Sequence, residues 1–443
     1  MLKKLKPILA IAMMLILCFS SLTALAADPP DDDDDDDDIP AGPAEIISTQ
    51  AAINKTLQLP IGTNTPDATF KFTAEKISID GVTTDEVRDT MPDIDESRLT
   101  LSFTQADTGT ENPPSDVVSV VKETGDIFAG INFPHAGIYV YEITEQGKTN
   151  PTIDDNDPDE VLTYSQAKYM VAVYVANNPL GTGTYIAGIG TRVVTNDAGE
   201  DASGNKVDAT PGGNGAEYLF SQMAFTNTYV KTNGPTDPEN PDPTSSSTLS
   251  VTKKVTGDYA SKEQYFDFKM SLSPPSLVTD VPEFYRAYIV ENDAVIDPKD
   301  NANASVIGED AGGNKYIEIS TTGETAFKLK DSQSLVFVDT PVGSNYVVTE
   351  AATPNYIPSY IVTTDSSAGT EVTGIMNTEL STKTQRVGER VNSADFTNNR
   401  ESVTPTGLNL NDLPFIGLIA LAIASLLIFL VAKSRKKDTR DRA

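Results

Sequence analysis

Alternating apolar and polar positions recur along two stretches of the chain and predict β-strands. ATFKFTAEKISI, AGIYVYEIT and KYMVAVYVA lie in the first stretch, and YFDFKMSL, SLVFVD and SNYVVTE lie in the second. Turn-forming residues separate these segments, and no long helical period occurs between the two ends of the chain. The sequence therefore predicts an all-β protein with two tandem β-sandwiches, over residues 45–230 and 248–400.

Two segments lack this pattern. Residues 231–247 contain four prolines and three consecutive serines, a composition typical of an interdomain linker. Residues 27–44 include an unbroken run of aspartates from Asp31 to Asp38, which predicts a disordered acidic arm because like charges repel one another. Calcium binding is the alternative for this run, but the run lacks the glycine turn and the spaced ligands of a calcium loop.

Apolar segments at both ends predict export and anchoring. Residues 1–26 contain three lysines, an apolar run and Ala-Leu-Ala, which is typical of a secretory signal peptide, and Cys18 is interpreted as part of its apolar run. Residues 413–432 are long and apolar enough for a transmembrane helix. Basic residues follow at once, within the C-terminal segment 401–443, so we expect the tail in the cytoplasm and the sandwiches outside.

Composition excludes several classes of function. With 33 basic and 64 acidic residues, the formal net charge is −31, which argues against nucleic acid as a partner. The single His (His135) and the single Cys (Cys18) leave no histidine cluster for zinc and no Cys-His pair. We therefore expect no metal, no cofactor and no enzyme that turns over.

The two predicted sandwiches repeat three landmarks in the same order. A lysine on the opening strand comes first, and an F-x-F motif follows it. An aromatic strand ending in Thr-Glu is the second landmark, and a closing Phe-Thr-Asn is the third. The landmark residues are Lys55, Glu145 and Asn227 in the first sandwich, and Lys253, Glu350 and Asn398 in the second.

Strand parity places each lysine inside its sandwich. Side chains alternate between the two faces of a strand, so Lys55 shares the apolar face of its strand with Ile53 and Leu57. Lys253 is on the apolar face of its strand by the same rule, whereas Lys254 points to solvent.

Burial gives this set a chemistry. It lowers the pKa of a lysine and raises that of a glutamate, so both can be neutral at pH 7. A neutral amine is a nucleophile, and a protonated glutamate can polarise an amide carbonyl by donating a hydrogen bond to it. Attack of the amine on the asparagine side chain, with Glu145 or Glu350 shuttling the proton, would release ammonia and leave an isopeptide bond. The alternative is an unreactive lysine with its amine at the surface and an edge asparagine.

Several motifs of the two sandwiches resemble those of a known family. TLSVTKKV, PVGSNYVVTE and FTNNRESVTPTG in the second sandwich, with GIYVYEITE and FTNTY in the first, are similar to the backbone pilins of Gram-positive bacteria. The resemblance covers roughly residues 45–443. It implies Ig-like (CnaB-type) sandwiches, with the isopeptide bond formed by the Lys, Glu and Asn residues named above.

The resemblance also implies a sorting signal. Its pentapeptide is Val403, Thr404, Pro405, Thr406 and Gly407, next to the apolar helix and the basic tail. A sortase would cut between Thr406 and Gly407 and transfer Thr406 to a lysine of another subunit or to a peptidoglycan precursor. Proline stands third, as in motifs of dedicated pilus sortases. Lys206 and Lys231 are the candidate acceptor lysines, since residues 207–226 contain none.

The sequence thus predicts a secreted pilus subunit on the wall of a Gram-positive bacterium, inserted in the membrane only until sorting. We expect sortase, other pilin subunits and a host or cell-surface ligand as its partners, and adhesion as its role. The alternative is a monomeric wall-anchored adhesin or ligand-binding protein.

Overall fold

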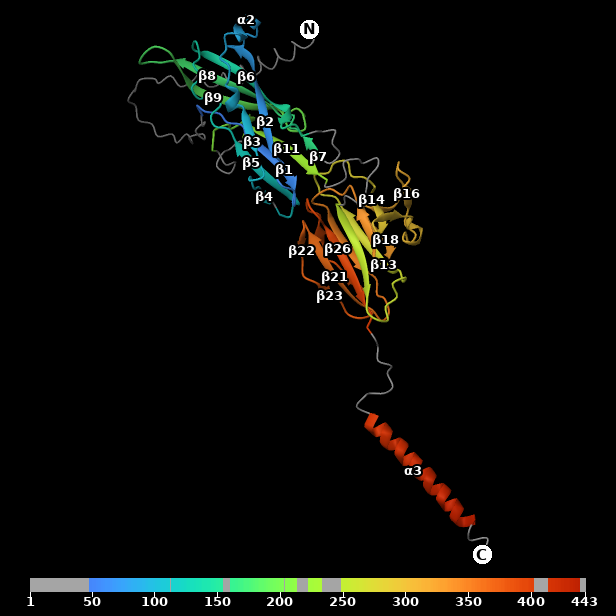
Figure 1. Cartoon of the computed structure of the whole chain (residues 1–443). Helices are drawn as coiled ribbons and strands as arrows, with labels where there is room; N and C mark the ends of the chain where they lie inside the picture. Colours follow the sequence, from blue (N-terminus) through green and yellow to red (C-terminus); the bar gives the residue numbers. More distant parts are fainter. Residues whose placement is uncertain are drawn as a thin grey trace, which may run out of the picture.

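The computed structural model describes residues 48–111, 113–153, 160–202, 204–212, 222–232, 248–401 and 413–438. Within these ranges the chain forms two β-sandwiches, one following the other, and a C-terminal helix (Figure 1). The predicted all-β class is confirmed. The predicted signal peptide 1–26, the acidic arm 27–44, nearly all of the linker 231–247 and the pentapeptide 403–407 lie outside the described residues.

The first sandwich packs a five-stranded sheet against a six-stranded sheet. The five-stranded sheet has the order β4 (Thr110–Glu111), β5 (Val117–Glu123), β1 (Asn54–Pro60), β11 (Ala224–Lys231) and β7 (Glu160–Thr163). The six-stranded sheet has the order β10 (Lys206–Val207), β9 (Thr184–Thr195), β8 (Lys168–Asn177), β6 (Gly137–Asn150), β2 (Ala68–Ile79) and β3 (Thr100–Phe103). Two short helical turns, α2 (Asp85–Arg88) and η2 (Glu96–Arg98), connect β2 to β3.

The second sandwich packs a ten-stranded sheet against a five-stranded sheet. The larger sheet runs β16 (Ile307–Glu309), β17 (Lys315–Ser320), β14 (Phe284–Glu291), β19 (Gln333–Phe337), β12 (Leu249–Thr256), β26 (Ser393–Asn399), β21 (Ile357–Thr364) and β22 (Ser367–Ala368), with β15 (Ala294–Ile296) on β14 and β23 (Val372–Thr373) on β21. The smaller sheet runs β18 (Glu324–Leu329), β13 (Phe266–Ser273), β20 (Asn345–Glu350) and β24 (Leu380–Ser381), with β25 (Gln385–Arg386) on β20. The turn η3 (Pro298–Asp300) follows β15.

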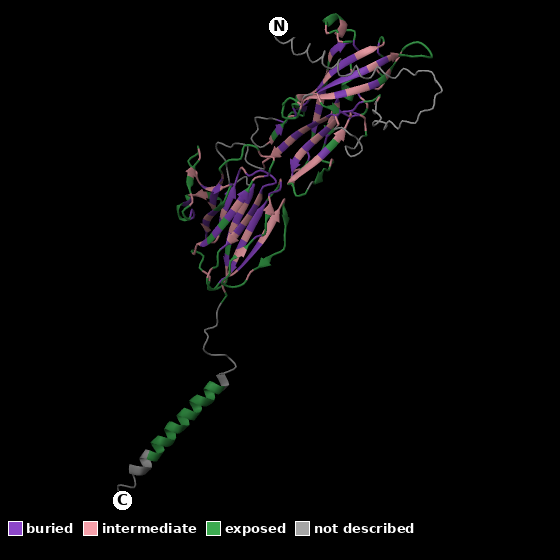
Figure 2. Ribbon diagram, turned by 180° about the vertical axis from the view of Figure 1, so that it is seen from behind, coloured by how far each residue is buried: buried purple, intermediate pink, exposed green. Residues whose placement is uncertain are grey.

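Buried residues alternate along the strands and fill the space between the two sheets of each sandwich (Figure 2). This alternation follows from the two-residue period of a strand, which presents every second side chain to the facing sheet. The second sandwich has one large apolar cluster, which includes Phe268, Phe327 and Phe396. The first sandwich has two main clusters, one around Phe72 and Phe225 and the other around Leu57 and Phe70.

The opening and closing strands of each sandwich lie side by side and run parallel. In the first sandwich β1 pairs with β11, and in the second β12 pairs with β26. Parallel strands require a long crossover connection, and here nearly the whole sandwich forms that connection. The first and last residues of each fold are therefore brought together by hydrogen bonds of the main chain.

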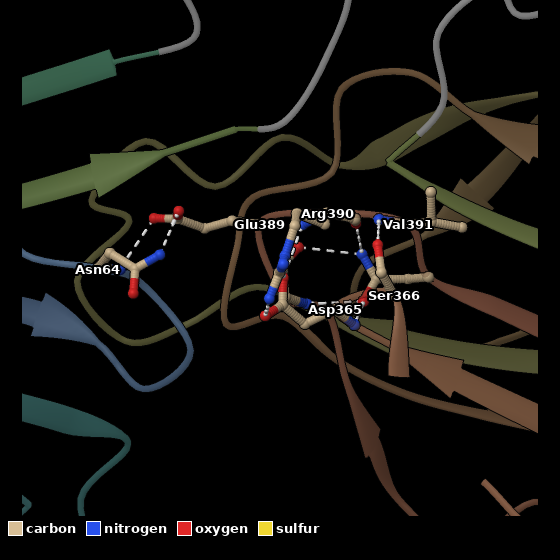
Figure 3. A network of polar contacts seen from close by, with 8 residues as sticks. Asn64, Asp365, Ser366, Glu389, Arg390 and Val391 are labelled. Atoms are coloured by element: carbon tan, nitrogen blue, oxygen red, sulfur yellow. Dashed lines mark hydrogen bonds and ion pairs between the residues drawn. The ribbon is translucent and has the colours of Figure 1, made fainter. Parts of the chain in front are cut away.

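The two sandwiches contact each other through backbone and side-chain hydrogen bonds. Val342 N–H donates to the Lys231 carbonyl at 2.8 Å. The backbone N–H of Asn64 donates to Glu389 Oε1 at 2.8 Å, and its side-chain Nδ2 donates to Glu389 Oε2 at 2.6 Å. In Figure 3, Glu389 stands next to Arg390, which binds Asp365 in its own sandwich. Gly343 has φ +89°, and a Cβ there would lie 2.6 Å from Pro60 Cβ. A larger residue at this position would push the two sandwiches apart.

Helix α3 spans Leu413–Asp438, and its segment Phe415–Lys433 is long and apolar enough to cross a membrane. The helix therefore extends beyond the predicted span 413–432. The added residues are mostly lysine, arginine and serine, and lysine and arginine favour helix almost as well as leucine does. The side chains from Phe415 to Lys433 are exposed.

Candidate functional site

The structure brings Lys55, Glu145 and Asn227 together between the sheets of the first sandwich. Lys55 is on β1 and Asn227 on the neighbouring β11, and Glu145 reaches them from β6 in the facing sheet. Lys55 Nζ lies 2.8 Å from Glu145 Oε1 and donates to Oε2 at 2.9 Å, and Asn227 Nδ2 donates to Oε1 at 2.9 Å. All three side chains are fully buried, so the amine and the amide meet on one carboxylate oxygen away from water.

The second sandwich repeats this arrangement. Lys253 Nζ lies 2.8 Å from Glu350 Oε1, and Asn398 Nδ2 donates to that oxygen at 2.6 Å. Lys253 is 2% exposed, Glu350 is fully buried and Asn398 is 1% exposed, whereas the neighbouring Lys254 is exposed to solvent. Strand parity thus distinguishes the inward lysine from its outward neighbour.

The registers of the two sites match residue by residue. Asn227 pairs with Leu57, two residues beyond Lys55, and Asn398 pairs with Val255, two residues beyond Lys253. The second phenylalanine of each F-x-F motif pairs with the glutamate, as Phe72 with Glu145 and Phe268 with Glu350. The repeated landmarks in the sequence therefore correspond to the same positions in two similar sandwiches.

The first phenylalanine of each F-x-F motif lies under the amine. Lys55 Nζ is 4.7 Å from the ring centre of Phe70, and Lys253 Nζ is 4.2 Å from that of Phe266. The face of an aromatic ring attracts a cation, but the ring carries no lone pair that could accept a conventional hydrogen bond from the amine. The carboxylate is therefore the polar partner of each amine in both sites.

Burial shifts the pKa of both members of each pair toward the neutral form. It lowers the pKa of Lys55 to about 8, and the attraction of Glu145 only partly opposes this; the pKa of Lys253 falls to about 8 for the same reason. Burial also raises the pKa of Glu145 and of Glu350, against the attraction of the lysines. Proton transfer from lysine to glutamate is thereby made easier, and it yields a neutral amine beside a carboxylic acid.

One feature of the first site differs from the expectation that glutamate polarises the amide carbonyl. Glu145 faces the amide nitrogen of Asn227, and the carbonyl oxygen Oδ1 instead accepts the backbone N–H of Ser165 at 2.7 Å. Sequence reasoning missed Ser165 because every residue except proline carries a backbone N–H. Its local signal is its place in the loop two residues after the short strand β7.

The two candidate acceptor lysines occupy different surroundings. Lys206 is exposed on β10, the edge strand of the six-stranded sheet. Lys231 ends β11 where the second sandwich begins, with its Nζ 3.9 Å from a Glu160 oxygen and its carbonyl bound to Val342.

In the part of the chain that the structure describes, no group of three or more His, Cys, Asp or Glu side chains is arranged to hold a metal ion.

The fold and the two sites define a class: tandem β-sandwiches that each hold a buried Lys-Glu-Asn set between the opening and closing strands. Two family models match the two sandwiches. The family described as "Spy0128-like isopeptide containing domain" matches residues 51–230, and a domain of unknown function, DUF7601, matches residues 247–400. The first sandwich is therefore similar to the Spy0128-like isopeptide family.

A curated relative and two solved structures that cover most of the chain are pilins. A pilin of Streptococcus pyogenes serotype M1 is 23% identical over 339 residues, which cover 75% of this chain and 76% of the relative. Two solved structures, the major pilin from Streptococcus pyogenes and the major pilin protein (T3.2) from Streptococcus pyogenes serotype GAS13637, each cover 80% of this chain and 99% of their own. Their identities are 19% and 18%, and their TM-scores are 0.30 and 0.27. The resemblance to backbone pilins of Gram-positive bacteria is confirmed by the family and the curated relative, which support a pilus subunit.

Proposed function

We propose that this chain is a cell-wall-anchored structural pilus subunit, stabilised by one Lys-Asn isopeptide bond in each sandwich and joined to other subunits or to peptidoglycan by a sortase. The observation that favours this most is the occurrence of two buried Lys-Glu-Asn sets in matching register. A buried ion pair is costly to maintain, and reaction with the neighbouring amide would remove its charges. The fibre so formed would support adhesion.

The bond would form once in each sandwich, without cofactor. Lys55 Nζ attacks Asn227 Cγ, the Cγ–Nδ2 bond breaks, and ammonia leaves. Glu145 gives its proton to the departing Nδ2 and takes one back from Nζ, so it is unchanged at the end. Lys253, Glu350 and Asn398 would react in the same way.

Intact mass tests this chemistry. The recombinant segment 48–401 is expected to be lighter than its sequence by two molecules of ammonia. Replacing Glu145 or Glu350 with alanine should restore one molecule each, because each sandwich reacts by itself. A measured mass equal to that calculated from the sequence of the unmodified segment would exclude both bonds. A deficit that persists in a glutamate variant would remove that glutamate from the mechanism.

The rate of bond formation is expected to pass through a maximum with pH. The reactive pair holds one proton, on the carboxyl. Lowering the pH protonates the amine and removes the nucleophile, and raising the pH above about 8, the pKa to which burial lowers Lys55, removes the last proton and with it the acid. Segment 48–401, isolated unfolded and unreacted, would be refolded at each pH and its mass followed with time. A rate that keeps rising well above pH 8 would contradict the acid role of Glu145.

For polymerisation we propose Lys206 as the acceptor and Thr406 as the residue transferred to it. Lys206 is exposed on an edge strand, whereas Lys231 lies where the two sandwiches meet, a place that a sortase thioester reaches poorly. Expression with a pilus-class sortase should give a ladder of high-mass species in wall extracts. Lys206→Arg should abolish the ladder, and the matched Lys231→Arg should leave it. A single band from the unmodified chain would favour the monomeric adhesin.

A further inference from the structure

The side-chain amide of Asn227 is held from two sides. Its Nδ2 donates to Glu145 Oε1, and its Oδ1 accepts the Ser165 backbone N–H at 2.7 Å in a buried contact. A backbone N–H can only donate, so the atom that faces it must be the carbonyl oxygen. The orientation of the amide is thus fixed: the nitrogen that would leave points to the carboxyl, and the oxygen points to the N–H.

We propose that the Ser165 backbone N–H is the oxyanion donor for isopeptide formation in the first sandwich, an inference that rests on the proposed function. When Lys55 Nζ adds to Asn227 Cγ, negative charge develops on Oδ1, which already lies at hydrogen-bond distance from this donor. Glu145 then protonates Nδ2, the Cγ–Nδ2 bond breaks, and the Oδ1 carbonyl reforms. Glutamate and the N–H therefore act on different atoms of the amide.

Asp197 links the donor to the strand that bears Asn227. Its Oδ1 accepts the Ser165 hydroxyl and, at 2.9 Å, the backbone N–H of Thr226. Its carbonyl accepts the backbone N–H of Gln166 at 2.9 Å. Since Thr226 adjoins Asn227, these contacts hold the segment with the donor against the segment with the reacting amide before any reaction begins.

The second sandwich has no counterpart to this donor among the described residues. Asn398 Nδ2 contacts Glu350 as in the first site, but Asn398 Oδ1 is buried without a hydrogen-bond partner there. Loss of one oxyanion donor typically slows a reaction by about 100-fold or more. On refolding, we therefore expect the Lys55–Asn227 bond to form before the Lys253–Asn398 bond in the same chain.

Removing only this N–H tests the proposal. Ser165 would be replaced by its α-hydroxy acid analogue, which turns the peptide bond before it into an ester, in a chain synthesised with a suppressor tRNA and isolated unfolded. On refolding, the first bond should form about 100-fold more slowly than without the ester. The second bond should form at its usual rate and serves as an internal control. The matched control is an ester at Ala167, whose N–H donates to the Ser165 hydroxyl at 3.1 Å.

The outcomes separate this proposal from the proposed function. A chain without esters that loses no ammonia would overturn the proposed function itself. A chain that loses two, and keeps its rate in the Ser165 ester, would overturn only the oxyanion donor. Equal slowing by both esters would also overturn it, because the effect would then be general disturbance of the loop. Thermal unfolding of both ester variants in the unreactive Glu145→Ala background measures separately how much each ester lowers the stability of the fold.

Discussion

Replacing Asn398 with alanine is expected to lower the melting temperature of the second sandwich by about 10–20 °C. Without the amide, no bond can join β12 to β26, and the unfolded chain between Lys253 and Asn398 regains the freedom of an open loop. The chain-entropy model gives about 5 kcal/mol for a loop of this length. For a domain of this size, about 1 kcal/mol corresponds to roughly 2–4 °C. Differential scanning calorimetry of segment 48–401 measures the shift.

The matched control is Thr397→Ala on the same strand. Thr397 points away from the core and belongs to no crosslink, so its replacement should change stability by about 0.5 kcal/mol or less. Glu350→Ala should lower the free energy of unfolding more than Asn398→Ala does. It prevents the bond and also leaves Lys253 buried without its partner, which costs about 3–5 kcal/mol more. If the Asn398→Ala and Thr397→Ala variants had the same melting temperature, a covalent bond at Asn398 would be ruled out.

How far the site could be predicted depends on which interactions are local in sequence. The inward direction of Lys55 and Lys253 follows from strand parity alone, and the repeated order of landmarks identifies the glutamates and asparagines. Parity could not have assigned the two-residue offset between lysine and asparagine, since that offset depends on how β1 pairs with β11. It becomes visible only when the two strands are placed side by side.

Contacts between distant residues could not be predicted. Asn64 and Glu389 are 325 positions apart and meet only because the sandwiches are docked end to end. Asp197 and Ser165 are polar residues of loops, where such residues are expected in any case, and no pattern distinguishes them from their neighbours. The ten strands of the larger sheet include two-residue segments such as β22 and β23, which are too short for any periodicity.

The parallel pairing of opening and closing strands determines how each sandwich would respond to force. Tension enters the second sandwich at the start of β12 and leaves at the end of β26, so the two strands are loaded in shear. A bond from Lys253 to Asn398 would pass the tension directly between these strands. When force is applied at the two ends of segment 48–401, the residues between them would remain folded without load, and so would those between Lys55 and Asn227 in the first sandwich. In a fibre joined at Lys206, force would instead enter the first sandwich at that lysine.

Single-molecule stretching is therefore expected to show no unfolding step for the unmodified pair of sandwiches. Asn227→Ala should introduce one step of about 600 Å, the extended length of the chain between residues 55 and 227 less its folded span, since an extended residue contributes roughly 3.5 Å. The second sandwich of the same molecule stays closed and is the internal control, and Thr226→Ala, next to the bond but outside it, should add no step. A step of this size in the unmodified chain would show that the first sandwich lacks its bond, because covalent closure leaves no other route for that length to be released.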